Sequence, residues 1–192
     1  LRPGDTMVYY EINPQVVEHA ERYFTYLSDA RARGADVEVR VGDARLVLES
    51  EQRNTGQPKY DLLIVDAFSS DSIPVHLITD EACAIYRSMV TEHGVIAFHI
   101  TNRFLNLEPV LSTLSRRAGW RGYRYDHLDL ANGAAFDERT GETVSSWVLM
   151  TARPEHLAEL AGDSHLRPLQ GQSQRIWSDD YSNLLSVFEV RF

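Results

Sequence analysis

Hydrophobic and polar positions in the first half of the chain alternate between short β-branched runs and longer amphipathic segments. The strand-length runs are residues 7–12, 36–41 and 60–67, and the helical segments are residues 14–27 and 44–52. Asn13 and Pro14 stand where a helix usually begins, as N-cap and first helical residue. This alternation is typical of βαβ units and predicts a mostly parallel sheet.

Two of these segments predict burial as well as secondary structure. The run 60–67 is apolar on both faces, which predicts a strand covered by helices on either side. In the helix 14–27, apolar residues at helical spacing predict one buried face. They are Val16, Val17, Ala20, Tyr23, Phe24 and Leu27.

The pattern changes in the second half of the chain. Residues 77–90 and 107–118 are helical segments on either side of a strand at 94–100. Two strand-like runs then follow, 120–128 and 144–152, with no helical pattern between them, and this predicts an antiparallel hairpin. Further along, a late helix is expected at 154–162 and a short segment at 178–188. Parallel βαβ units that end in a hairpin describe the α/β, Rossmann-like sheet of the class I methyltransferase fold, although other doubly wound folds share this composition.

Composition narrows the class of protein. A length of 192 residues suits one well-buried domain, so we expect a single domain over residues 1–192. The residues are 43% hydrophobic, and no apolar run approaches the roughly 18 residues that span a bilayer. Cys83 is the one cysteine, which excludes an internal disulfide, and its apolar surroundings predict a buried helix position. The net charge of −9 disfavours a nucleic-acid partner and is compatible with a cationic ligand.

Acidic residues end three successive predicted strands. Glu11, Asp43 and Asp66 all follow apolar runs, and in open α/β sheets ligands bind at the carboxyl ends of the strands. A carboxylate at Glu11 can accept both hydroxyls of a ribose, while Asp43 can accept from an adenine amine and the Ala44 N–H can read a ring nitrogen. The alternative for Asp43 is an N-cap on the helix that begins at Ala44.

Asp66 and Asp71 form the strongest pair of candidate site residues. Asp66 ends a very apolar strand, and a half-buried charge usually has a partner or a task. Asp71 follows five positions later, ahead of Pro74. Two carboxylates near one pocket can hold a cationic amine and deprotonate the amine that reacts. The alternative for Asp71 is a simple turn residue.

Four ordered segments together resemble spermidine synthases and the spermidine synthase-like domains often fused behind a membrane-spanning region. They are YEINPQVVEHA (10–20), VGDARLVLE (41–49), YDLLIVDAFSSDSIPVHLITDEA (60–82) and WSDDYSNLL (177–185). The resemblance covers nearly the whole chain and implies the class I methyltransferase fold. It also implies that the co-substrate is decarboxylated S-adenosylmethionine, with S-adenosylmethionine as the alternative.

The resemblance assigns a role to each matched residue. Glu11 would bind the ribose of the adenosyl ligand, and Asp43 with Ala44 the adenine. Asp66 would be the catalytic base, and Asp71 would close over the polyamine. The implied reaction is transfer of an aminopropyl group to a diamine such as putrescine.

Three departures from the family pattern are visible. The family loop usually reads D-S-x-D, whereas Asp66 and Asp71 are five positions apart. The glycine-rich loop and the central first strand that carries it have no counterpart, so the chain is expected to be an N-terminally truncated fragment. The small N-terminal β domain of true spermidine synthases is also absent from the 192 residues.

Two further functions stay open at this point. One keeps the fold and the adenosyl ligand but transfers a methyl group, and the other is a non-catalytic domain of a membrane protein that binds an adenosyl ligand. A homodimer and a fused membrane-spanning region are compatible with the resemblance. The expected location is the cytoplasm, or the cytoplasmic face of a membrane if such spans are present.

Several polar residues have weaker assignments. His99 and Asn102 follow a strand at the ligand-facing edge, so they are candidates to line the pocket, although a strand-end histidine is more often structural. Asp179 and Asp180 match the late acidic pair of the family, with helix capping as the alternative. The seven histidines lack metal-ligand spacing, so no metal site is expected.

Overall fold

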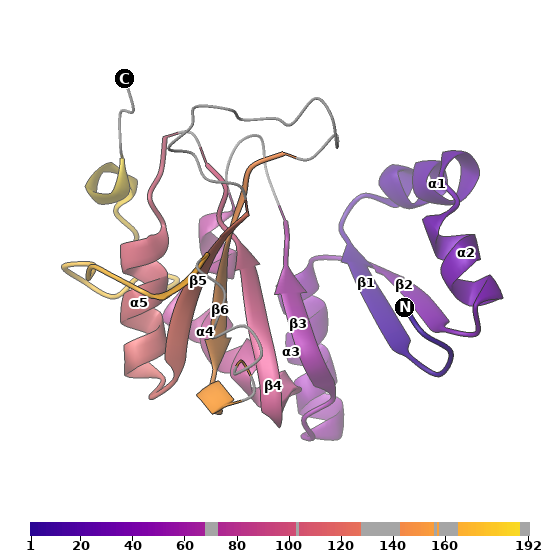
Figure 1. Ribbon diagram of the computed structural model, residues 1–192, viewed down its shortest axis with the longest axis horizontal. Helices are drawn as coiled ribbons and strands as arrows, with labels where there is room; N and C mark the ends of the chain where they lie inside the picture. Colours follow the sequence, from indigo (N-terminus) through magenta and orange to yellow (C-terminus); the bar gives the residue numbers. More distant parts are fainter. Residues whose placement is uncertain (68–72, 103, 128–142, 156, 158–164, 189–192) are drawn as a thin grey trace. The chain divides into compact units, whose positions relative to one another are not determined.

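The computed structural model describes residues 1–67, 73–102, 104–127, 143–155, 157 and 165–188 (Figure 1). The chain divides into two compact units, Leu1–Gly56 and Gln57–Phe192. Within the described ranges, none of the helices is long and apolar enough to cross a bilayer.

The first unit contains a parallel pair of strands and three helices. The strands are β1 (Thr6–Glu11) and β2 (Asp36–Val41), and the helices are α1 (Pro14–Tyr23), α2 (Tyr26–Ala32) and α3 (Ala44–Thr55). Glu11 pairs with Val41, so both strands end at the same edge. The Asn13 side chain accepts a hydrogen bond from the Gln15 N–H at 2.9 Å, which confirms the expected start of α1.

The helix expected over residues 14–27 is interrupted, so this prediction is wrong in detail. Phe24 adopts extended backbone angles (φ −122°, ψ 151°) and ends α1, and α2 begins two residues later. Phe24 and Thr25 are aromatic and β-branched residues, which lose side-chain freedom in a helix. Beyond the interruption, the Tyr26 ring packs edge-on against Tyr9 at a centroid distance of 6.2 Å.

The interruption also changes which apolar residues are buried. Leu27 is buried with Ala35 and Val37, whereas Val16 and Phe24 are exposed by 47% and 62%. The single apolar face predicted for this segment is therefore wrong. The core of the first unit forms between α2 and β2 instead.

The second unit contains a five-stranded sheet. Its strands are β3 (Tyr60–Val65), β4 (Val90–His99), β5 (Arg121–His127), β6 (Ser145–Thr151) and β7 (Leu166–Pro168), in the order β3-β4-β6-β5-β7. β3 and β4 are parallel, and the remaining pairs are antiparallel. The predicted hairpin is confirmed as β5–β6, whose register pairs Arg121 with Thr151. The fold class, an α/β arrangement with parallel strand pairs that ends in an antiparallel hairpin, is confirmed with it.

Among the described residues, no backbone ladder joins β1 to β3. β1 pairs with β2 alone, and β3 pairs with β4 alone.

The core of the second unit lies between the sheet and two helices, α4 (Asp80–Met89) and α5 (Glu108–Arg117). α4 packs against β4, and α5 packs against β5 and β6 (Figure 1). Phe98 of β4 and Met150 of β6 are fully buried, as is Cys83 of α4, which confirms the position expected for the cysteine. The late helix expected at 154–162 falls largely outside the described residues.

One face of β3 differs from expectation. Leu63 and Val65 are buried, whereas Leu62 and Ile64 on the other face are exposed by 53% and 46%. The prediction that both faces of this strand are covered is therefore wrong for one face.

A segment near the C-terminus is tied to the start of α4. The Asp80 N–H donates to the Trp177 carbonyl at 2.9 Å, and the Thr79 hydroxyl donates to Asp179 at 2.8 Å. The Asp179 N–H in turn donates to Glu81 at 3.0 Å. Trp177 is 1% exposed, so an apolar anchor accompanies these bonds. We call the contact of residues 177–179 with residues 79–81 the α4 clasp.

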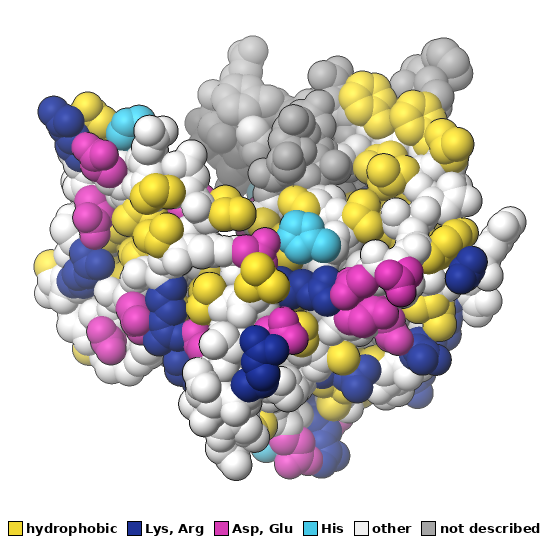
Figure 2. Space-filling model, turned by 180° about the vertical axis from the view of Figure 1, so that it is seen from behind, with side chains coloured by type: hydrophobic (Ala, Val, Ile, Leu, Met, Phe, Trp, Pro, Cys, Tyr) yellow, Lys and Arg dark blue, Asp and Glu magenta, His cyan; other side chains and the backbone are white. Residues whose placement is uncertain are grey.

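Charges on the described surface are mixed. On the face shown in Figure 2, Lys and Arg side chains lie among Asp and Glu side chains and do not form a continuous basic patch. The exposed pair Arg153 and Glu92 is an example of such neighbours.

Candidate active site

Glu11 and Asp43 lie together in the first unit. Glu11 is the last residue of β1, and its carbonyl accepts the Gly42 N–H at 2.9 Å. Asp43 directly follows Gly42, so both acids stand at the carboxyl edge of the β1–β2 pair. The Glu11 carboxylate accepts the Asn13 N–H at 2.8 Å, which fixes its orientation beside the start of α1.

Asp43 has the structural role that the sequence analysis gave as its alternative. Its Oδ1 accepts the Leu46 N–H at 3.1 Å and caps α3. Ala44 is the first residue of this helix, so its N–H has no intrahelical acceptor. The adenine-binding role of Asp43 and Ala44 stays a prediction.

Asp66 lies in the second unit, one residue after β3. Val65 pairs with Phe98 in the parallel ladder, so Asp66, just after β3, lies beside His99, the last residue of β4. Asp66 Oδ1 is 2.7 Å from His99 Nδ1. The Asp66 side chain is 51% exposed and the His99 side chain 22%. The partner that the sequence analysis expected for Asp66 is therefore His99.

The second acid of the loop, Asp71, lies outside the described residues. Glu11 and Asp43 belong to one unit and Asp66 to the other. The convergence of all three acids on one ligand therefore stays a prediction.

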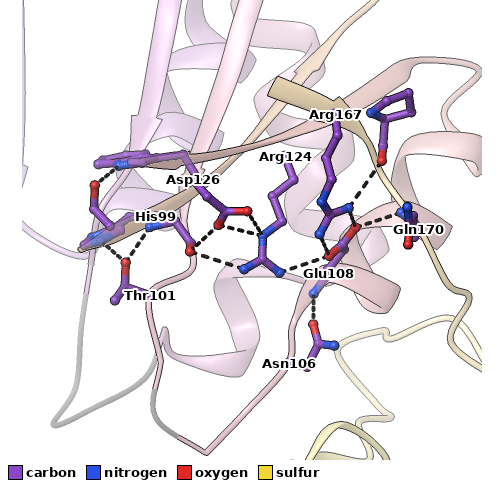
Figure 3. A network of polar contacts seen from close by, with 12 residues as sticks. His99, Thr101, Asn106, Glu108, Arg124, Asp126, Arg167 and Gln170 are labelled. Carbon is purple, nitrogen blue, oxygen red and sulfur yellow. Dashed lines mark hydrogen bonds and ion pairs between the residues drawn. The ribbon is translucent and has the colours of Figure 1, made fainter. Parts of the chain in front are cut away.

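His99 is held on two further sides. Its Nε2 lies 2.7 Å from the Thr101 hydroxyl, and its ring stacks on Trp147 at a centroid distance of 4.5 Å and an interplanar angle of 15° (Figure 3). Asn102, the other candidate of this region, accepts the N–H groups of Phe104 and Leu105 at 2.8 Å each. Asn102 thus shapes the turn that follows β4.

A chain of hydrogen bonds continues from Thr101 into the interior (Figure 3). The Thr101 hydroxyl oxygen accepts the Ser146 N–H at 2.8 Å, and the Ser146 hydroxyl donates to Asp126 at 2.6 Å. Asp126 also accepts two bonds from Arg124 Nε, at 2.8 and 2.9 Å. The end of β4, the end of β5 and the start of β6 are thereby connected.

This series of hydrogen bonds ends on a buried carboxylate that sequence reasoning missed. Glu108, at the start of α5, accepts bonds from Arg124 at 3.0 Å, from Arg167 at 2.6 and 2.7 Å, and from the Gln170 N–H at 2.8 Å. Burial alone raises the pKa of Glu108, but the bonds from Arg167, the Gln170 N–H and Arg124 outweigh it and hold the pKa below its ordinary value. No sequence motif marks this cluster, because its members come from α5, β5, β7 and the loop that follows.

Asp179, the first residue of the late acidic pair, has a structural role. Asp179 takes part in the α4 clasp through Thr79 and Glu81. Among the described residues, no group of three or more His, Cys, Asp or Glu side chains is arranged to hold a metal ion.

Comparison with known proteins shows what the chain is similar to. No family model matches the chain. A polyamine aminopropyltransferase of Vibrio vulnificus is 35% identical over 96 residues, which are 50% of this chain and 30% of that protein. The resemblance to this family is thereby confirmed over half the chain.

Solved structures agree on the fold. A probable spermidine synthase of Corynebacterium glutamicum superposes with a TM-score of 0.56 at 15% identity, over 92% of this chain and 64% of its own. Human methyltransferase-like protein 13, in complex with SAH, gives a TM-score of 0.54 at 19% identity, over 91% of this chain and 74% of its own. The chain therefore has a class I methyltransferase-like fold, and it spans less than two thirds of the spermidine synthase and of the Vibrio relative.

Proposed function

We propose that this chain, which is similar to polyamine aminopropyltransferases over half its length, carries out aminopropyl transfer from decarboxylated S-adenosylmethionine to a diamine such as putrescine. The observation that carries the proposal is Asp66 at the carboxyl end of β3, held by His99 at the end of β4. A strand-end carboxylate with a fixed partner is suited to accept a proton from an amine.

The proposed reaction is an in-line displacement. The neutral amine attacks the methylene next to the sulfonium, the new C–N bond forms as the C–S bond breaks, and the sulfur leaves with the bonding electron pair as neutral methylthioadenosine. The amine proton passes to Asp66. Holding the two reactants in line and removing this proton supply most of the rate enhancement.

Four other residues have proposed binding roles. Glu11 accepts the ribose hydroxyls, and Asp43 with the Ala44 N–H binds the adenine. Asp71 holds the ammonium group at the far end of the diamine. The net charge of −9 favours such a cationic substrate.

Methyl transfer is the second candidate, because the fold is compatible with both reactions. The human methyltransferase superposes about as well as the probable spermidine synthase, with TM-scores of 0.54 and 0.56. The fold alone therefore does not separate the two reactions. Asp66 favours aminopropyl transfer, because that reaction needs a proton acceptor for an amine.

Product analysis tests the proposal. Incubation with decarboxylated S-adenosylmethionine and putrescine should give methylthioadenosine and spermidine by mass spectrometry. Formation of S-adenosylhomocysteine from S-adenosylmethionine, with no methylthioadenosine in the first reaction, would support methyl transfer instead. Binding of both ligands without any product would support the non-catalytic domain.

The role of Asp66 is tested by Asp66→Asn. This variant keeps the shape of the side chain but removes the proton acceptor, so we expect turnover to fall by roughly 10²-fold or more while adenosyl binding by calorimetry stays unchanged. The matched control is Asp61→Asn on the same strand, whose carboxylate accepts from Thr91 at 3.1 Å. Wild-type turnover in Asp66→Asn would remove Asp66 from the mechanism.

A further inference from the structure

His99 contacts the proposed base directly and is fixed from three directions. Asp66 lies at Nδ1, Thr101 lies at Nε2, and Trp147 covers one face of the ring. We propose that His99 is a positioning residue that holds the Asp66 carboxylate in the orientation needed to accept the amine proton. This inference rests on the proposed function, since it concerns the same base.

The hydrogen-bond inventory assigns the imidazole proton. An ionised Asp66 can only accept, so His99 Nδ1 must carry a proton and donate it to Oδ1. In a neutral ring Nε2 is then the acceptor, and the Thr101 hydroxyl donates to it. The Thr101 oxygen meanwhile accepts the Ser146 N–H at 2.8 Å, which leaves its proton for the ring.

The contacts at Thr101 and Trp147 make this orientation rigid. The Ser146 N–H belongs to the β6 backbone, so the Thr101 hydroxyl that faces His99 is fixed to the sheet. The stacked Trp147 ring restricts rotation of the imidazole out of its plane. A donor held this way defines the plane of the Asp66 carboxylate and presents its second oxygen, Oδ2, to the amine.

Two substitutions separate this role from simple packing. His99→Phe keeps a flat ring on Trp147 but removes both nitrogens, and His99→Asn keeps an amide N–H near the position of Nδ1 but loses the stacked ring. We expect His99→Phe to lower kcat roughly tenfold with little change in KM for either substrate, and His99→Asn to stay within about threefold of the wild type. Thermal unfolding of both variants shows whether they fold.

The kcat values of the two variants together decide whether the proposal stands. Wild-type kcat in His99→Phe would overturn the proposal. So would a loss in His99→Asn as large as that in His99→Phe, because the role would then belong to the ring and not to the donor.

Nitrogen NMR of the histidine ring gives a readout that needs no turnover. Near neutral pH we expect the His99 proton on Nδ1 in the wild type, and its transfer to Nε2 in Asp66→Ala, where Thr101 becomes the remaining partner. A wild-type ring protonated on Nε2 alone would overturn the proposal. If the enzyme forms no product but the Nδ1 proton is found, the proposed function fails while the contact between His99 and Asp66 stands, so the two failures are told apart.

Discussion

Glu108 is a carboxylate with 5% side-chain exposure that has two arginines as neighbours. The loss of hydration on burial is offset only because four hydrogen bonds, from Arg124, Arg167 and the Gln170 N–H, satisfy its oxygens. Such a group is more costly to break than to replace as a whole, since removal of one partner leaves the others buried and uncompensated.

We therefore expect Glu108→Gln to lower the free energy of unfolding by about 3 kcal/mol, because the neutral amide removes the charge that faces both arginines. Urea unfolding measures the change. The matched control is Glu92→Gln, which breaks the exposed ion pair with Arg153 and should cost far less than Glu108→Gln. Equal losses in the two variants would contradict the role given to burial.

The contact between Asp66 and His99 shows what sequence could and could not predict at this scale. The strand-end position of Asp66 is visible in the alternation of apolar and polar residues. Its partner depends on the register that pairs Val65 with Phe98, and no local pattern encodes that register. Sequence reasoning therefore found both residues but did not pair them.

At the scale of elements, the N-cap residue of α3 has both a structural role and a proposed binding role. Asp43 caps the helix through Leu46, and the same carboxylate is proposed to bind adenine. Substitutions that differ in capping ability separate these roles, since serine is a good N-cap without a charge and alanine is a poor one.

We expect Asp43→Ser to keep stability within a few tenths of a kcal/mol, and Asp43→Ala to lose about 1 kcal/mol. Both should weaken adenosyl binding, because neither has the carboxylate that accepts from the adenine amine. Thermal unfolding and calorimetry give the two quantities. Full adenosyl affinity in Asp43→Ser would leave Asp43 with the capping role alone.

The elements themselves were largely predictable, because caps and apolar periods are local signals. β2 has the predicted bounds of 36–41, and Asn13 caps α1 as expected. The interruption at Phe24 was not predictable, since the apolar spacing continues through it and the contact of Tyr26 with Tyr9 is tertiary. The strand β7 was missed because three residues that include Pro168 carry little pattern.

At the scale of the whole molecule, the Glu108 cluster links stability to pH. The pKa of Glu108 in the folded protein lies below its ordinary value of 4.5, so over the range between the two values the unfolded chain binds more protons than the folded protein. The stabilisation is complete above the ordinary value and is lost as the pH falls through the folded-state pKa.

We expect the free energy of unfolding to decrease as the pH is lowered from about 6 to about 3, with a smaller slope in Glu108→Gln, which has no carboxylate at this site. Denaturant unfolding at several pH values measures the slope. An unchanged slope in Glu108→Gln would assign the acid sensitivity to other groups.

The α4 clasp has a consequence for the order of events during synthesis. Thr79 and Asp179 are separated by 100 positions, so the bond between them cannot form until nearly the whole described chain has left the ribosome. Until then, the start of α4 has its own Thr79 cap, through the Ala82 N–H, but neither the tail that covers it nor the buried Trp177. Nascent chains that end before Trp177 should therefore expose this end of the helix to proteases, and those that extend beyond Asp179 should protect it.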